Sequence, residues 1–408
     1  MKRILLAIAV LFAGQLAFGQ NINDHKISFS YIQLPLQKID TQYDNYEVKV
    51  EHAYQQANED STAMFQIRQE AAVNVFHDLM KGYQRDRDSL DKIYLRQLSD
   101  WEKKTNAGTK NPDGTALAKP APPMYPAPPA YPMMDSPQLH SEYADDNVNQ
   151  RISLAGYEQG PAEVVITINM LPIRNISIAK SKKGTGSSTV YQYYAKYIMP
   201  IGLKVESPTQ GVLMETTLFE NVQSYKMKDQ KSQYDHDIYM MDNKETFFRE
   251  LEAYARSKAL ASVNDHLNNQ FGFVEKNRTA EIYSVKSFKN YDYSDVTDAF
   301  TKTTFALQAV GNDRDRDGAM DLIDEALNAI KGILEESSVS DNKARINPKI
   351  TAMLQCNLAE LYIWQAEFDK ADATVNIAMN SGEGKAKRHC KDELGFYRDQ
   401  RTRWNVHY

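Results

Sequence analysis

Cysteine and glycine are scarce in this sequence of 408 residues, which contains 2 Cys and 18 Gly. Two cysteines exclude a disulfide-dense miniprotein and a zinc site built from four cysteines. The low glycine content excludes collagen and glycine-rich solenoids. An excess of positive charge is also absent, because 48 Lys and Arg stand against 54 Asp and Glu, so we predict no nucleic-acid partner. What is present is a hydrophobic content of 42%, enough for ordinary cores.

Only one long hydrophobic run occurs, and it lies at the start of the chain. Met1-Lys2-Arg3 is basic, residues 4–12 are apolar, and Ala17-Phe18-Gly19 has the small-x-small pattern of a cleavage site. This order predicts a secretory signal peptide over residues 1–19. The run is short of the ~20 residues that a membrane helix needs, and we predict no membrane span after cleavage. We therefore expect an exported protein that is periplasmic, associated with the outer membrane, or extracellular.

Two separated regions have strand character. Apolar residues alternate with polar ones at Ile27, Phe29 and Tyr31, and again at Tyr46 to Val50. Further candidate strands lie at 164–170, 190–205, 212–219 and 282–285. An amphipathic helix is predicted over 244–269, between the last two of these strands. The pattern predicts one α+β domain of residues 20–52 plus 163–290, with an antiparallel or mixed sheet covered on one face by this helix.

Residues 53–162 form a long insertion between these two regions. In its first half, apolar side chains recur at spacings of three, four and seven, which predicts a long helix with one narrow apolar stripe. The stripe consists of Phe65, Ala72, Phe76, Leu79, Tyr83, Leu90, Tyr94, Leu98 and Trp101. A single helix would be about 80 Å long at 1.5 Å per residue. A helical hairpin broken near residues 59–61 is the alternative.

The second half of the insertion is rich in proline. Nine of the 15 prolines fall in residues 112–137, which include the repeated pattern Ala-Pro-Pro-x-Tyr-Pro at 121–126 and 127–132. This composition favours polyproline II, which would span about 80 Å at 3.1 Å per residue. We predict a polyproline segment that returns along the helix and covers its stripe. The order is similar to pancreatic-polypeptide-like miniature folds and to streptococcal adhesin stalks, and a disordered linker is the alternative.

The C-terminal region carries a pattern of large and small residues over 351–379. It consists of Leu358-Ala359, Tyr362, Ala366, Phe368, Ala371, Val375 and Ala378. This pattern resembles the tetratricopeptide repeat, in which small residues let two helices approach closely and large ones fill the groove. Ala366 stands where that family usually has a glycine at the turn. The resemblance implies that Leu358, Tyr362 and Phe368 belong to a framework that binds a partner.

A weaker second match lies upstream, with residues 319–327 as one helix and 301–310 as the helix before it. Residues 385–404 would form a capping helix, as repeat proteins require. We therefore predict tetratricopeptide-like helical repeats over 291–408. The family resemblance implies binding of a protein or peptide, although a fold alone does not identify the partner.

An acidic segment between the two matches resembles a calcium loop. Its carboxylates are Asp313, Asp315, Asp317, Asp321 and Asp324. Closely spaced carboxylates with a glycine for a sharp turn are what a hard cation needs, and the spacing is similar to thrombospondin-type and dockerin-type loops. The competing interpretation is a charged turn between helices, because residues 319–327 already fit a repeat helix. Calcium is the only cofactor that the sequence suggests.

The two cysteines lie one repeat period apart, since Cys356 and Cys390 differ by 34 positions. Equivalent positions on neighbouring helices lie ~8–10 Å apart between helix axes, and a disulfide requires Cα atoms within about 7 Å. A bridge and two buried thiols therefore both remain open. No Ser-His-Asp set or Cys-His pair stands out in the sequence, so we predict that the protein is not an enzyme.

These observations predict an exported, non-catalytic scaffold or adaptor protein of the bacterial cell envelope. It would bind another envelope protein or peptide through its helical repeats. The alternative is a glycan- or peptidoglycan-binding envelope protein, which the 24 Tyr and 3 Trp of an exported chain suggest.

Overall fold

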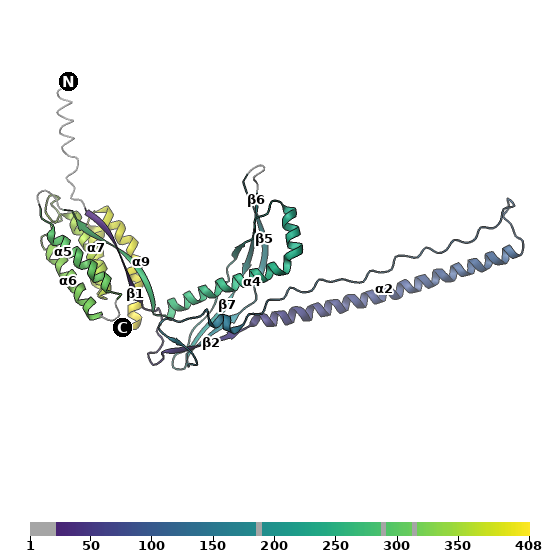
Figure 1. Cartoon of the computed structure of the whole chain (residues 1–408), viewed down its shortest axis with the longest axis horizontal. Helices are drawn as coiled ribbons and strands as arrows, with labels where there is room; N and C mark the ends of the chain where they lie inside the picture. Colours follow the sequence, from purple (N-terminus) through teal and green to yellow (C-terminus); the bar gives the residue numbers. More distant parts are fainter. Residues whose placement is uncertain (1–21, 185–189, 287–290, 312–315) are drawn as a thin grey trace, which may run out of the picture.

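The structure is a computed structural model that describes residues 22–184, 190–286, 291–311 and 316–408 (Figure 1). The predicted signal peptide, residues 1–19, lies outside these ranges. The described chain combines long helices with antiparallel and mixed sheets, and this confirms the predicted α+β class.

The largest sheet has the strand order β3-β2-β4-β7-β8. Its strands are β3 (Glu158–Gln159), β2 (Asn45–Glu51), β4 (Val165–Met170), β7 (Ile201–Ser207) and β8 (Gly211–Leu218). β2 runs parallel to β3 and β4, whereas β4, β7 and β8 are antiparallel, so the sheet is mixed. Ile166, Ile168 and Met170 are fully buried on one face, as the alternation predicts.

A smaller sheet and one long helix complete this part of the molecule. The sheet has the order β5-β6-β9, from β5 (Arg174–Lys183), β6 (Val190–Ile198) and β9 (Gln223–Lys226). The helix α4 (Gln233–Phe271) shares a hydrophobic cluster with β4, β6 and β7. It ends at Phe271, two residues beyond the predicted end, and it begins after Ser232, whose side chain accepts a hydrogen bond from the Asp235 amide. The helix is therefore 39 residues long and starts eleven residues before the predicted 244–269.

A separate hydrophobic cluster joins a two-stranded ribbon to the C-terminal helices. The ribbon pairs β1 (Ile22–Gln33) with β10 (Val274–Val285) in antiparallel register. Its apolar residues share one cluster with α5 (Ser294–Ala309), α6 (Arg316–Leu334), α7 (Pro348–Trp364), α8 (Phe368–Asn380) and α9 (Gly384–His407). The predicted α+β domain of 20–52 plus 163–290 thus contributes to two clusters, and the predicted 291–408 unit shares its core with β1 and β10.

The insertion forms a projecting arm (Figure 1). Its outward half is one unbroken helix, α2 (Ala53–Asn106), and its inward half returns beside the helix to the short helix α3 (Asp145–Asn149). Contacts follow the whole length of α2: the Trp101 indole donates to the Leu117 carbonyl at 3.0 Å, and the rings of Phe76 and Tyr131 lie 5.2 Å apart. At the base, Asn58 and the backbone of His140 exchange two hydrogen bonds.

Buried polar groups hold the arm against α4. The Arg256 guanidinium lies 4.5 Å over the Tyr54 ring and donates to Glu252 at 2.9 Å. Glu252 also accepts from the Ser141 amide at 2.7 Å, and the Arg256 guanidinium donates to the Ser141 carbonyl at 2.6 Å. Because Arg256 is 1% exposed and Glu252 is 4% exposed, their ion pair is shielded from water and fixes where the returning segment meets the body.

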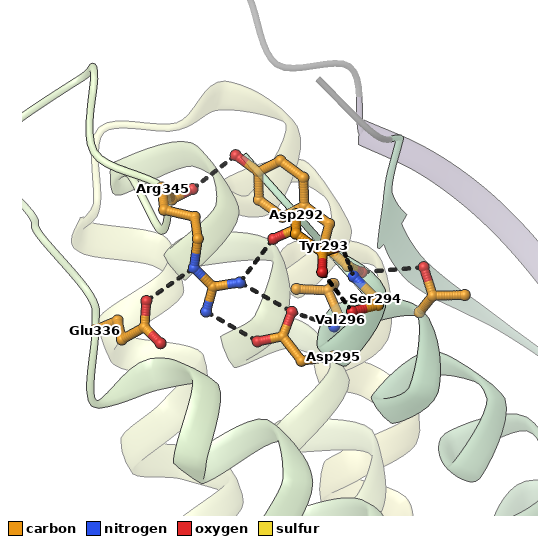
Figure 2. Close-up of polar contacts among 8 residues, drawn as sticks. Asp292, Tyr293, Ser294, Asp295, Val296, Glu336 and Arg345 are labelled. Carbon is orange, nitrogen blue, oxygen red and sulfur yellow. Dashed lines mark hydrogen bonds and ion pairs between the residues drawn. The ribbon is translucent and has the colours of Figure 1, made fainter. Parts of the chain in front are cut away.

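A second polar network ties the long α6–α7 connection to the start of α5 (Figure 2). Arg345 donates to both oxygens of Asp295, at 2.9 and 2.8 Å, and to Glu336 at 2.8 Å. The Tyr293 hydroxyl donates to the Arg345 carbonyl at 2.9 Å. Hydrogen bonds from Arg345 hold the pKa of Asp295 below its usual value. These charges satisfy one another, so the network acts as an anchor for residues 336–346.

Candidate functional site

A cavity of about 430 Å³ opens on the helical region. It lies between the end of β1, the start of α6, the turn from α7 to α8 and the end of α9. Its walls are mainly apolar and include Ile32, Met320, Trp364, Phe368 and Trp404. We call this cavity the aromatic groove. It combines side chains from both ends of the chain, because β1 packs among the C-terminal helices.

The aromatic rings of the groove are fixed by contacts with one another. Trp364 packs edge-on against Tyr31, with ring centroids 5.0 Å apart. Trp404 stacks on Tyr408 at 4.1 Å and lies 6.4 Å from Phe368. Tyr408 is 73% exposed, so one face of this stack is open to solvent at the rim. The groove therefore presents large, ordered apolar surfaces of the kind that bind aromatic or aliphatic groups.

A buried ion network lies directly behind Trp364. The Arg278 guanidinium donates to Glu360 at 2.7 Å and to Glu393 at 2.8 Å. Glu360 also accepts from the Trp364 indole at 2.9 Å and from the Tyr397 hydroxyl at 3.2 Å. The hydrogen bond from the indole sets the orientation of the tryptophan ring in the groove wall.

The paired charges of this network shift the pKa values of one another. Burial by itself would raise the pKa of Glu360, but the charge and hydrogen bonds of Arg278 outweigh it and hold that pKa below the usual value. Burial would likewise lower the pKa of Arg278, and Glu360 and Glu393 raise it instead. Both groups stay charged over the ordinary pH range, which suits a structural support and gives no proton donor or acceptor to the groove.

Two polar side chains of α9 complete the site. Arg403 donates to the Leu34 carbonyl at 2.7 Å and to the side chain of Asn269 at 2.7 Å, which ties the end of α9 to the end of β1. Gln400 lines the groove, and its amide nitrogen is buried and has no partner among the described residues. An unpaired buried donor is costly to the fold.

The three predicted partner-binding residues occupy different places. Phe368 is the first residue of α8 and lines the groove. Leu358 and Tyr362 lie on α7 and are 3% and 6% exposed, within the hydrophobic cluster of the helical region. The amino groups of Lys331 and Lys370 lie 5.3 and 5.9 Å from the centre of the Tyr362 ring. The structure thus brings one of the three to the groove and places the other two in the core behind it.

The five predicted calcium ligands fall on both sides of the boundary of the described residues. Asp313 and Asp315 lie outside them. Asp317, Asp321 and Asp324 lie on α6 and are exposed, and Asp324 accepts a hydrogen bond from Gln365. Within the described ranges, no three His, Cys, Asp or Glu side chains lie close enough together to hold a metal ion. Calcium binding stays a prediction.

The two cysteines lie in contact inside the helical region. The Cys356 and Cys390 sulfur atoms are 3.8 Å apart, and both side chains are buried as free thiols. Their hydrogen bond raises the pKa of Cys356 and lowers that of Cys390. This polarised contact between α7 and α9 would need only a short approach of the two sulfur atoms to become a disulfide.

Sequence reasoning missed most of the aromatic groove. Tyr31 and Ile32 were expected in a separate sheet, and the pairing of β1 with β10 spans about 250 positions, which leaves no local signal. Trp364 and Trp404 give a weak sequence signal, because large aromatic side chains near the ends of α7 and α9 are costly to expose. Only Phe368 followed from the repeat pattern.

Comparison with protein-family models, curated proteins and solved structures finds no match for this chain. Across the described ranges, no helix is both long and apolar enough to cross a membrane. The geometry of the groove therefore carries the functional argument: its aromatic walls can bind an apolar group.

Proposed function

We propose that this chain is an exported, non-catalytic adaptor of the bacterial cell envelope. Its C-terminal helical region would bind another envelope protein, or an extended peptide from one, in the aromatic groove. The observation that carries this proposal is the groove itself, whose walls include the ordered rings of Trp364, Phe368 and Trp404. Such sites bind through apolar contact and use few polar groups for orientation.

The helical pair α7–α8 supports a tetratricopeptide-like interpretation of this region. Pro348 occupies the first turn of α7, and Ala359, Ala371 and Ala378 are buried between the helices. Ala366 at the turn has φ of +60°, which is the conformation for which that family uses glycine. On this interpretation the ends of β1 and α9 complete the groove that α7 and α8 begin.

The chemistry of the groove favours a peptide with one large apolar side chain. Trp364 and Phe368, which both line the groove, would contact that side chain. Protein anchors of this kind supply most of the binding energy of an interface.

A pull-down from envelope fractions tests this proposal. The mature chain should retain a protein partner, and the Ile32→Asp variant should lose it, because a carboxylate at the groove wall would remain without a partner. Val339→Asp is the matched control, since Val339 is 76% exposed and does not line the groove. Equal recovery with both variants, or recovery of the chain alone, would contradict the proposal.

The stacked pair Trp404–Tyr408 favours a second candidate, a glycan or peptidoglycan strand. Sugar rings bind to exposed aromatic faces, and one face of this stack is open. Isothermal titration with soluble peptidoglycan fragments distinguishes the candidates, because heat that disappears in Tyr408→Ala would favour the glycan.

A further inference from the structure

The small sheet β5-β6-β9 concentrates positive charge. Its strands, together with the residues that continue β9 as far as position 231, contain eight basic residues and one acid, Asp229. The basic residues are Arg174, Lys180, Lys182, Lys183, Lys196, Lys226, Lys228 and Lys231. This local charge of +7 lies in a chain whose net charge is −6. The sheet is therefore a cationic part of an acidic molecule.

One face of this sheet is closed by the start of α4 (Figure 1). Tyr193 and Met227 point to this face and are 1% and 5% exposed. The Tyr193 ring stacks on the ring of His236 in α4, with the ring centroids 3.8 Å apart. The Lys180 amino group donates to the Gln233 side chain of α4 at 2.9 Å. The first turns of α4 therefore block this face.

The opposite face of the sheet is open and carries lysines. Because side chains alternate along a strand, the residues next to the buried Tyr193 and Met227 point to this second face. In the strand register Lys196 lies between Ser177 and Ser224, small neighbours that leave its ammonium group open to solvent. We call this surface the lysine face, after its four exposed lysines: Lys183, Lys196, Lys226 and Lys228.

The lysine face has few carboxylates to neutralise it. Lys226 pairs with Asp229 at 3.1 Å, and the Lys226 side chain stays 52% exposed. A hydrogen bond from Lys226 and the charge of Lys183 hold the pKa of Asp229 below its usual value, so one acid serves two lysines. Among the described residues, neither Lys196 nor Lys228 forms an ion pair with a carboxylate. The face therefore presents an excess of positive charge to solvent.

The lysines are spread in two dimensions rather than along a line. Lys183 lies on β5, Lys196 lies on β6, and Lys226 and Lys228 lie at the end of β9 or just after it. A linear polyanion would meet only a row of such charges, whereas a surface of anions meets all of them. A lysine ammonium is a point charge without the fork with which arginine selects one carboxylate or phosphate. We propose that the lysine face docks the protein on a membrane surface of anionic lipid headgroups.

Charge rather than insertion holds this contact. Among the described residues of the lysine face, no large apolar side chain is exposed. Each lysine near an anionic lipid surface strengthens binding about fivefold, so four lysines give on the order of several hundredfold. The acidic remainder of the chain does not prevent docking, because charges more than ~10 Å away are largely screened at about 0.1 M salt. Binding should therefore weaken steeply as the salt concentration rises.

Co-sedimentation with lipid vesicles tests the docking on the full mature chain. We expect the chain to bind vesicles that contain phosphatidylglycerol and not vesicles of phosphatidylcholine alone. The K196Q/K228Q variant should bind about 25-fold more weakly, because two lysines of the face are lost. K387Q/K391Q is the matched control, since it removes the same charge from exposed positions on α9 and should change binding less than about twofold. Circular dichroism should show the same secondary structure in all variants.

Three results would overturn the docking. They are equal binding to both kinds of vesicle, equal losses in the two double variants, and vesicle binding that persists at about 0.5 M salt. Retention of dextran sulfate without vesicle binding would also contradict the proposal, because it would assign the lysine face to an acidic polymer. None of these results depends on the aromatic groove, so the docking and the proposed function can fail separately.

Discussion

Replacement of Glu360 by alanine should destabilise the helical region more than any surface change. Glu360 is 2% exposed and accepts hydrogen bonds from Arg278, Trp364 and Tyr397. Its removal leaves the buried Arg278 guanidinium with Glu393 as its one carboxylate partner among the described residues. Breaking a buried pair in this way costs about 3–5 kcal/mol, because the remaining charge is still desolvated.

Urea unfolding followed by tryptophan fluorescence measures this loss, since Trp364 and Trp404 both lie in the helical region. With a slope of about 2.5 kcal/mol per molar urea, a loss of 4 kcal/mol lowers the midpoint by about 1.6 M. Glu367→Ala is the control: Glu367 pairs with Lys370 at 3.1 Å on the surface, and its loss should cost under about 0.5 kcal/mol. A loss below about 1 kcal/mol for Glu360→Ala would refute the role given to the network.

The pKa of Glu360 also predicts the direction in which stability changes with pH. Pairing lowers the pKa of Glu360 in the folded state relative to the unfolded chain. Its contribution to stability is therefore complete above the unfolded value of about 4.5 and is lost as the pH falls through the lower folded value. The Glu360→Ala variant should lose less stability than the parent on acidification through this window.

Three further predictions concern the helical region. Burial lowers the pKa of His389 below 6.5, so the unfolded state binds more protons near pH 6 than the folded state does. The free energy of unfolding should therefore fall as the pH drops from 7.5 to 5.5. Chemical denaturation at each pH should show that His389→Phe removes this slope. Mild oxidation should join Cys356 to Cys390, which intact-mass spectrometry would detect as the loss of two hydrogens. Closing this loop should raise the free energy of unfolding by about 4 kcal/mol. The mass and stability of the Cys390→Ala variant should not change on oxidation. Ala366→Gly should stabilise the fold by about 0.5–1 kcal/mol in thermal unfolding, because Ala366 has φ of +60°; a lower melting temperature would show that the lost methyl contacts outweigh the strain.

The fold class and the long helix could be predicted because they depend on local periodicity. The alternation at Ile166 and Ile168 reflects which side chains face the core. The helical spacing from Phe65 to Trp101 reflects the side of α2 that the returning segment contacts, although Leu79 of that stripe is 56% exposed. The start of α4 could not be predicted in this way, because the helix begins at a Ser232 cap in a polar stretch without an apolar stripe. Capping groups outweigh the missing pattern there.

The candidate site was less predictable than the fold because it is built by long-range packing. The repeat pattern placed Phe368 at a helix boundary, and that residue does line the groove. Tyr31 reaches the groove only because β1 pairs with β10, and Glu360 gains its role only because β10 brings Arg278 beside α7. Partners so distant in sequence leave no signal in the local spacing of residues. The sequence therefore did not indicate Tyr31 or Glu360 as part of the site.

Site-specific photo-crosslinking in intact cells tests the central claim most directly. A photoreactive amino acid at Tyr408, on the exposed rim of the groove, should form an adduct with one envelope protein, and the same probe at Val339 should not. Mass spectrometry of the adduct would identify the partner and its contact segment, which we expect to contain a large apolar side chain. Identical adducts from both positions, or a glycan adduct at Tyr408, would contradict the claim that the aromatic groove binds a protein.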